Sequence, residues 1–293
     1  MKKFLFSLLH WTGVLKCVSW LNRRKLTILC YHSVTASEEL ARYDPHKLRI
    51  PVQRFQEQLN HLRNNYRVIS LTDFLVAKRD NRRLPDYSVV IMFDDGFRDF
   101  LTVAADHLVR WKLPATVFII TDRANNSSHS GGETYLSWRE VQQLAASGIQ
   151  IGSHTCSHPR LLDLPFDELR RELAEAQRAI LNHVNQGDVP LSYPYGQTSE
   201  VISELAQSLG YSSGITGSLG PNGTESNVFL LNRTVIASDD DLATFAARVS
   251  GLTWWASKVI QLFGFRNSQD WDPAVSALRI DGGRTYDYSE SAN

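Results

Sequence analysis

Two adjacent carboxylates, Asp94 and Asp95, follow a continuous apolar run and precede a glycine. The run is apolar at nearly every position, as expected of a strand that is buried on both faces. Burying two carboxylates at its end without partners is costly, and a metal ion would remove that cost. One carboxylate would then bind the ion while the other acts as a base. Taken alone, Asp-Asp-Gly is also a common turn from a strand into a helix, because aspartate caps helices and Gly96 allows a sharp turn.

An imidazole pair, His154 and His158, follows a second strand-like segment. Two imidazoles four residues apart face the same side if the segment is helical or tightly turned. Two histidines and one aspartate form a typical hydrolytic metal site, because they leave positions free for water and substrate. Both the pair and the Asp-Asp sequence follow strands, and barrel enzymes carry their active sites at that end of the strands. The sequence therefore predicts that these residues meet.

A third turn follows an apolar run at Leu191, where the chain reads Leu-Ser-Tyr-Pro-Tyr-Gly. Backbone N–H groups in such a turn are able to point towards a developing oxyanion. The rings of Tyr193 and Tyr195 are candidates for stacking on a sugar ring. The alternative for this segment is a simple Pro-Gly turn without a chemical role.

Strands that alternate with helices must position these turns. The clearest strands are expected at 26–31, 88–93, 115–120, 149–153 and 189–193, with weaker ones at 67–70, 212–216 and 229–236. Between them, a capping box begins a helix at Ser137, and Gly148 ends it. This alternation predicts an α/β fold with a parallel sheet, and seven or eight strands favour a distorted (β/α) barrel. A doubly wound open sheet is the rival, but no glycine-rich phosphate-binding turn follows any strand.

The barrel domain is expected at 26–238, with an amphipathic helix on either side of it. Residues 1–25 form the first, with apolar residues at helical spacing, and residues 239–265 form the second, which contains Trp254 and Trp255. The tail, 266–293, lacks periodicity and is expected to be disordered.

The first helix raises the question of membrane contact. Its apolar run is too short to span a bilayer, and it has no convincing cleavage site for a secretory signal. Positive charges beside its apolar face suit a helix lying at a membrane surface, and packing on the barrel fits the pattern equally well. We therefore expect a cytoplasmic protein or one that is peripheral at the membrane.

The overall charge of the chain is balanced. Lys and Arg number 31 and so do Asp and Glu, which gives no indication of a nucleic-acid partner. Three cysteines, Cys17, Cys30 and Cys156, are widely spaced and are expected to be free thiols. The sequence does not indicate an oligomeric state.

Over about 26–238, the chain resembles the polysaccharide deacetylase family, also called carbohydrate esterase family 4. Phe93-Asp94-Asp95-Gly96 matches the first motif of that family, the segment from His154 to His158 matches the second, and Tyr-Pro-Tyr-Gly is a variant of the third. The resemblance implies Zn²⁺, or alternatively Co²⁺ or Ni²⁺, held by Asp95, His154 and His158. It also implies a glycan substrate, Asp94 as general base, and the backbone N–H of Tyr195 as a donor to the oxyanion.

The chain departs from the family pattern at two places. Ser192 stands where the third motif often has an arginine that orients the base, and no histidine after His183 is available as general acid. His32, at the end of the first strand, is the best substitute, because a similar Tyr-His pair opens related deacetylases of exopolysaccharide type. A packed or capping histidine is the alternative reading of His32.

The leading hypothesis is a metal-dependent hydrolase that removes N-acetyl, or alternatively O-acetyl, groups from amino sugars of a polysaccharide or lipid-linked glycan. A catalytically silent glycan-binding barrel is the alternative, favoured by the two departures and opposed by the retained ligands and base. A glycosidase that uses Asp94 and Asp95 fits less well. Neighbouring strand residues point to opposite faces, whereas a glycosidase needs two carboxylates that flank one bond.

Overall fold

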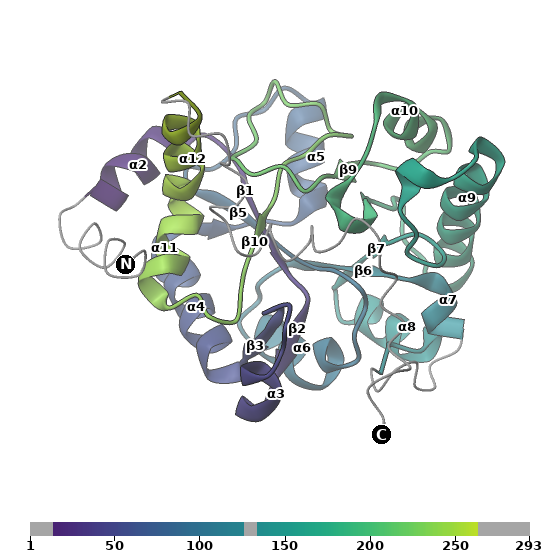
Figure 1. Ribbon diagram of the computed structural model, residues 1–293, viewed down its shortest axis with the longest axis horizontal. Helices are drawn as coiled ribbons and strands as arrows, with labels where there is room; N and C mark the ends of the chain where they lie inside the picture. The colour runs from purple at the N-terminus through teal and green to yellow at the C-terminus, as the bar shows by residue number, and fades with distance from the viewer. Residues whose placement is uncertain (1–13, 126–133, 263–293) are drawn as a thin grey trace.

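The computed structural model describes residues 14–125 and 134–262, and its main element is an eight-stranded parallel sheet. The sheet curls through the centre of the molecule, with helices on its outside (Figure 1). Its spatial order is β10-β1-β5-β6-β7-β8-β9, with β4 beside the start of β5. The predicted α/β fold with seven or eight parallel strands is thus confirmed. The strands are β1 Thr27–Tyr31, β4 Arg67–Val68, β5 Ser88–Phe93, β6 Ala115–Ile119, β7 Gln150–Ser153, β8 Leu191–Ser192, β9 Gly214–Ile215 and β10 Thr234–Val235.

The two ends of this strand order meet. Ile215 in β9 forms a parallel bridge with Leu231, which lies just before β10, and β10 pairs with β1. The Leu231 N–H donates to Gly214 O at 2.9 Å, and the Thr216 N–H donates to Leu231 O at 2.8 Å. These bonds close the barrel.

Strands on the closing side are shorter than the sequence predicts. The expected strands at 189–193, 212–216 and 229–236 are reduced to two residues each in β8, β9 and β10. In β8 the reason is Pro190, which has no N–H to donate to a neighbouring strand. The predicted strand positions are correct, and the predicted lengths are wrong.

Helices between the strands cover the outside of the sheet (Figure 1). Capping residues define several of them: Ser137 and Glu140 form the predicted capping box of α8, and Gly148 follows that helix with φ 91°. The helices are α2 Val14–Asn22, α3 Glu38–Arg42, α4 Val52–Asn65, α5 Leu71–Arg79, α6 Ala105–Arg110, α7 Thr121–Asn125, α8 Trp138–Ala146, α9 Phe166–His183, α10 Glu200–Ser208, α11 Leu242–Ser250 and α12 Leu252–Leu262.

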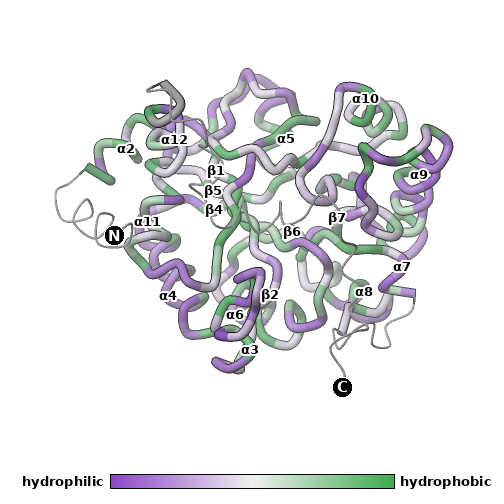
Figure 2. The backbone as a smooth tube through the Cα atoms, in the orientation of Figure 1, coloured by the Kyte–Doolittle hydropathy of each residue, from purple (hydrophilic) through white to green (hydrophobic). Residues whose placement is uncertain are grey.

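Side chains alternate between the two faces of each strand, and this alternation creates two separate hydrophobic clusters. One includes Leu29, Ile91 and Val117, which face the surrounding helices. The other includes Ile28, Val90 and other alternate strand residues, and it fills the barrel interior. Hydrophobic residues gather in the central strands, while the outer sides of α4 and α9 are hydrophilic (Figure 2). Because interior and exterior positions alternate with a period of two, the interior positions at the end of each strand are determined by its sequence.

Two features outside the main sheet were not predicted. Strands β2 Ser33–Thr35 and β3 Arg49–Pro51 pair in parallel immediately after β1. A short π-helix, Phe100–Ala104, leads into α6. The carboxylate of Asp99, at the start of this π-helix, accepts a short hydrogen bond from the Ser33 hydroxyl. This contact joins the segment that follows β5 to the segment that follows β1.

The two terminal helical regions pack together at the end of the barrel where the strands begin. Leu15 of α2 is buried against Ala246 and Ala247 of α11, and Asn22 Nδ2 donates to Ser250 O at 2.9 Å. The predicted single helix at 239–265 is wrong, because Gly251 adopts φ 83° and separates α11 from α12. A left-handed glycine ends a helix at little steric cost. Residues 1–13 and 126–133, and the tail beyond 262 that is expected to be disordered, lie outside the described residues.

No helix in the two described ranges is long and apolar enough to cross a membrane.

Candidate metal and active site

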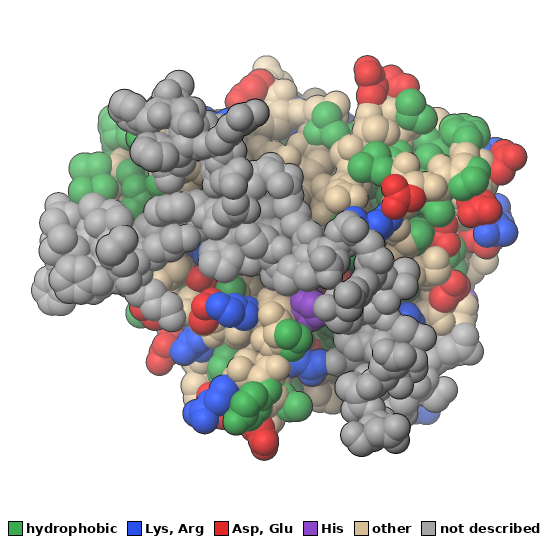
Figure 3. Space-filling view, in the orientation of Figure 1, with side chains coloured by type: hydrophobic (Ala, Val, Ile, Leu, Met, Phe, Trp, Pro, Cys, Tyr) green, Lys and Arg blue, Asp and Glu red, His purple; other side chains and the backbone are tan. Residues whose placement is uncertain are grey.

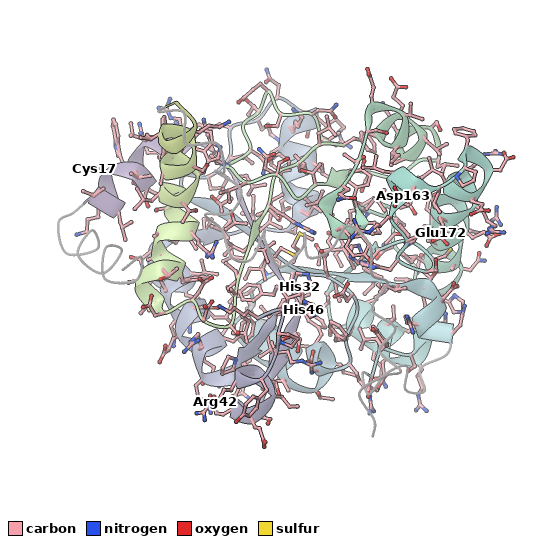
Figure 4. The ribbon with its side chains drawn as sticks, viewed as in Figure 1. Cys17, His32, Arg42, His46, Asp163 and Glu172 are labelled. Carbon is pink, nitrogen blue, oxygen red and sulfur yellow. The ribbon has the colours of Figure 1, made fainter. Side chains whose placement is uncertain are left out.

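The polar residues that the sequence singles out gather where the barrel strands end. His32 continues the inward alternation of β1, Asp94 that of β5, and His154 that of β7. Ser192 in β8 and Arg233 just before β10 occupy the equivalent inward positions on the closing side. All five side chains are at least 96% buried. Figure 4 shows His32 near the centre of the molecule, inside the ring of helices.

Asp95, His154 and His158 form a compact group with ligand geometry. Nε2 of His154 lies 3.4 Å from Asp95 Oδ1, and Nε2 of His158 lies 3.7 Å from the same oxygen. The two rings are 4.6 Å apart between centroids. Two ligand atoms that are each about 2.1 Å from a tetrahedral ion lie about 3.4 Å from one another. The three side chains therefore fit a divalent ion between them.

Hydrogen bonding and charge prepare these three side chains for a cation. Nδ1 of His154 lies 2.7 Å from the carbonyl oxygen of Ser192, so it carries the proton and leaves the Nε2 lone pair for the ion. Burial and the neighbouring His154 lower the pKa of His158 to about 4, so its ring is neutral. Burial raises the pKa of Asp95, but the hydrogen bond to His154 and the nearby imidazoles outweigh burial and keep it well below its usual range. Burial lowers the pKa of His154, but the Asp94 and Asp95 carboxylates outweigh burial and raise it, so this ring attracts a cation or a proton at Nε2. The group thus offers one carboxylate, a neutral His158 imidazole and a His154 imidazole whose Nε2 faces the carboxylates.

Strained backbone places several of these side chains. Asp95, His158 and Tyr195 all have positive φ, at 70°, 65° and 58°. Non-glycine residues rarely adopt this conformation, and it is concentrated at functional sites. Beside Tyr195, Gly196 also has positive φ, and a Cβ there would lie 2.3 Å from the Cα of Gly217. The turn after β8 consequently requires glycine at 196.

The loop that carries the second histidine is held by a glutamate from α9. The carboxylate of Glu172 accepts hydrogen bonds from the N–H groups of Cys156 and Ser157, both at 3.0 Å, and from the Ser157 hydroxyl at 2.7 Å. The His158 N–H donates to Thr155 Oγ1 at 3.1 Å. Two histidines four residues apart therefore face one point through a tight turn rather than through a helix.

The second carboxylate, Asp94, has two oxygens in different environments. Its Oδ2 accepts from the guanidinium of Arg233, from Ser192 Oγ at 3.1 Å and from the thiol of Cys30 at 3.5 Å. Its Oδ1 is buried and has no hydrogen-bond partner among the described residues. Burial raises the pKa of Asp94, but the charge of Arg233 outweighs burial and holds the pKa below its usual value. Asp94 is therefore ionised, with one oxygen fixed and the other available to act as a base.

Arg233 is the residue that sequence reasoning missed. It is 2% exposed, and its Nη1 donates both to Asp94 and, at 2.9 Å, to Ser192 Oγ. Ser192, in β8, stands where an arginine was expected. The guanidinium that contacts the Asp94 carboxylate comes instead from Arg233, in the segment just before β10. The available signal was the alternation of Leu231, Arg233 and Val235, which places a charge in an otherwise apolar inward series.

His32 lies beside the two carboxylates. Its ring is 4% exposed, and its Nδ1 is buried without a hydrogen-bond partner among the described residues. Burial lowers its pKa, although Asp95 and Asp94 act in the opposite direction. Cys30, His32 and Asp94 each offer an atom within 4.8 Å of the others. The His32 ring is thus placed to exchange a proton with a group bound in the mouth of the barrel, where the strands end.

The two tyrosines of the third turn have different positions. Tyr193 is fully buried, and its hydroxyl donates to Phe229 O at 3.0 Å, so the prediction that it stacks on a sugar is wrong. Because side chains alternate along the strand and Ser192 faces the barrel interior, Tyr193 faces the core between the barrel and the surrounding helices. The ring of Tyr195 is partly exposed, its centroid lies 4.7 Å from that of the His158 ring, and the guanidinium carbon of Arg160 lies 4.9 Å from the Tyr195 centroid.

Comparison with known proteins identifies the family. The family model described as polysaccharide deacetylase matches residues 81–214, which include the Asp-Asp-Gly, His154–His158 and Tyr-Pro-Tyr-Gly segments. Residues 81–214 therefore form a polysaccharide deacetylase domain. The predicted resemblance to this family is thereby confirmed, and such deacetylases depend on a metal ion, in agreement with the cluster of Asp95, His154 and His158.

Individual relatives of this deacetylase are distant. A putative polysaccharide deacetylase of Bacillus subtilis, YxkH, is 25% identical over 229 residues, covering 78% of this chain and 77% of that protein. The poly-beta-1,6-N-acetyl-D-glucosamine N-deacetylase of Staphylococcus aureus is 22% identical over 70% of this chain and 72% of its own length. The structure of the Streptococcus pyogenes deacetylase PplD superposes with a TM-score of 0.69 at 23% identity, covering 77% of this chain and 98% of that one. This superposition shows a shared fold.

Proposed function

We propose that the protein is a metal-dependent hydrolase that removes N-acetyl groups from amino sugars of a glycan, with Zn²⁺ held by Asp95, His154 and His158. The observation that carries this proposal is the asymmetry of Asp94. Three donors hold one of its oxygens, Oδ2, which lies 3.9 Å from Nε2 of the candidate ligand His154, while the other oxygen is buried and unpartnered among the described residues. A silent glycan-binding barrel has no use for an ionised carboxylate oxygen kept free in this position, because burying it is costly.

A divalent ion in this site would polarise the acetyl carbonyl and make a nearby water molecule more acidic. Asp94 is oriented to take the proton of the attacking water through Oδ1, since Arg233 and Ser192 hold Oδ2. The Tyr195 N–H, in its left-handed turn, is the candidate donor to the oxygen that becomes negative. His32 is the candidate donor of a proton to the departing nitrogen, because an amide anion is a very poor leaving group.

A glycosidase mechanism fits the site poorly. Carboxylates in such enzymes flank the scissile bond at about 5–10 Å from each other. Here both carboxylates contact one imidazole, since His154 Nε2 is 3.4 Å from Asp95 Oδ1 and 3.9 Å from Asp94 Oδ2, and Asp95 belongs to the candidate metal group. The arrangement supports one attacking water rather than two carboxylates acting across a sugar ring.

The S. aureus relative is named for an acetamido polysaccharide, which supports the same class of substrate here. The deciding experiment measures acetate released from defined acetamido oligosaccharides and polysaccharides, with Zn²⁺, Co²⁺ or Ni²⁺ added to metal-free protein. We expect release that depends on the ion and is lost in Asp94→Asn, with the bound metal retained. Undiminished acetate release by Asp94→Asn would rule out the proposed mechanism.

A further inference from the structure

Helices α2 and α12 expose apolar side chains that no described part of the chain covers. Trp20 and Leu21 of α2 are 54% and 58% exposed, and Trp255 and Val259 of α12 are 40% and 46% exposed. The two helices contact each other. Hydrophobic side chains gather at the upper left edge of Figure 3, where Figure 1 draws α2. Together with their cationic neighbours Lys16, Arg24 and Lys258, these residues form what we call the α2–α12 face.

The exposed residues recur at helical spacing. In α2, the buried Leu15 points to α11, while Lys16 and Trp20, one turn apart, are exposed on a different side. In α12, Trp255 and Val259 are likewise one turn apart and both exposed. Each helix thus has one side packed on the barrel and another that presents large apolar residues to solvent, which on a soluble protein marks an interaction surface.

The charged side chains of α2 and α12 are cationic. Neither helix contains an acidic residue, and the first acidic residue of the chain is Glu38. The chain as a whole is balanced, with 31 basic and 31 acidic residues, so the excess is local. Arg23 has a carboxylate partner, Asp86, at 3.7 Å. Tryptophan, leucine and cations on one surface are the composition of proteins that lie at the interface of an anionic bilayer.

The face lies at the end of the barrel opposite the candidate active site. α2 leads into the start of β1, and Thr27 at that start donates to Val249 O of α11 at 3.3 Å. The site residues lie where the strands end. Figure 4 draws Cys17 of α2 at the outer left edge and His32 in the centre of the molecule.

We propose that the α2–α12 face docks on an anionic membrane surface, with Trp20, Leu21, Trp255 and Val259 entering the boundary between headgroups and acyl chains. Docking in this orientation points the mouth of the barrel away from the bilayer. If the proposed function holds, the substrate presented to the mouth is a glycan polymer beyond the membrane surface rather than a sugar attached directly to a lipid headgroup.

Vesicle flotation of the full chain tests the docking independently of any activity. We expect binding to vesicles of phosphatidylcholine with phosphatidylglycerol, weaker binding at high salt, and little binding to phosphatidylcholine alone. Leu21→Glu with Trp255→Glu should reduce partitioning at least about tenfold, because it removes apolar insertion and adds repulsion. The matched control, Leu162→Glu with Leu181→Glu, changes two residues of 50% and 48% exposure elsewhere and should bind as the wild type does.

The proposal is overturned if the wild type fails to bind anionic vesicles, or if the two double variants bind equally. It is also overturned if sedimentation shows that the Leu21→Glu, Trp255→Glu change dissociates a dimer without altering vesicle binding, because the face would then bind a second copy. Acetate release from a soluble oligosaccharide should be as fast for vesicle-bound as for free protein. Absence of activity in both states would count against the proposed function and leave the flotation result intact.

A native cysteine reports on the face directly. Cys17 is exposed on α2, whereas Cys30 and Cys156 are buried. A polarity-sensitive fluorophore on Cys17 should shift its emission to shorter wavelength when anionic vesicles are added. The same fluorophore on Leu162→Cys, in a Cys17→Ser background, should not shift. Equal responses from the two positions would contradict the proposed orientation.

Discussion

Replacing Arg233 with methionine should change how the activity depends on pH. The guanidinium and the Asp94 carboxylate are 1% and 0% exposed at their side chains, so the substitution leaves a buried carboxylate without its charged partner. Breaking a buried ion pair in this way costs about 3–5 kcal/mol. Part of that cost is avoided if Asp94 takes up a proton, because the pKa of a buried, unpaired carboxyl group rises.

The magnitude follows from the conversion between pKa and free energy. A cost of about 3 kcal/mol corresponds to a rise of about two pH units in the pKa of Asp94. Because Asp94 must be ionised to act as a base, the acid limb of kcat/KM against pH should move up by about two units. At pH values below the acid limbs of both proteins, kcat/KM of the variant should be about 100-fold lower than that of the wild type. The difference should disappear as the pH rises above the limb of the variant.

The assay is the pH profile of acetate release, with Arg248→Met as a matched control. Arg248 and Asp240 form a second buried pair of arginine and carboxylate among the described residues, with Arg248 Nε 2.7 Å from Asp240 Oδ2, and they lie outside the site. Both variants should lose stability in chemical unfolding, but only Arg233→Met should shift the acid limb. Arg233→Lys should shift the acid limb less than Arg233→Met does, because it returns the positive charge without the guanidinium geometry.

A milder variant keeps the test usable if Arg233→Met does not fold. Ser192→Ala removes one hydrogen bond to Asp94 Oδ2, a loss of about 1 kcal/mol, and should raise the acid limb by somewhat less than one pH unit. The reasoning is refuted if neither variant moves the limb, or if Arg248→Met moves it as far as Arg233→Met does.

Three further predictions concern the ion, the proton donor and a buried acid. His158→Ala should lower metal content measured by elemental analysis, and chelation should abolish acetate release, whereas Asp94→Asn should keep one ion per chain. His32→Ala should reduce kcat about 10²–10⁴-fold for amides and less for activated esters, whose leaving groups need less protonation; an equal loss for both would contradict an acid role. Burial raises the pKa of Asp99 from 3.8 to about 6. Folding therefore favours its protonated form, and stability due to this group falls as the pH rises from about 4 to 6. Asp99→Asn should raise the free energy of unfolding at pH 8 by up to about 3 kcal/mol and leave it nearly unchanged below pH 4; equal effects at both would refute this.

Local sequence determined most elements and the order of the motifs. The apolar run before Asp94 and Asp95 predicts β5 because an uninterrupted β-rich segment must be buried on both faces. Ser137 with Glu140 predicts the start of α8 because the two residues satisfy its free N–H groups. The break at Gly251 was missed because a glycine within an amphipathic pattern ends a helix only where the backbone adopts positive φ, which depends on how α11 and α12 pack.

The sequence by itself determined the types of residue in the site: two carboxylates, two imidazoles at close spacing and His32. These features are local, since each motif sits within a few residues of a strand end. Only the tertiary structure decided which groups touch. Arg233 and Asp94 are separated by 139 positions along the chain and meet because the segment before β10 pairs with β9 on one side while β10 pairs with β1 on the other. Likewise, Tyr193 and Tyr195 look equivalent in the sequence, but alternation across β8 buries the first, and the left-handed turn leaves the second beside His158. Contacts of this kind follow from barrel closure and strand register, which no short segment specifies alone.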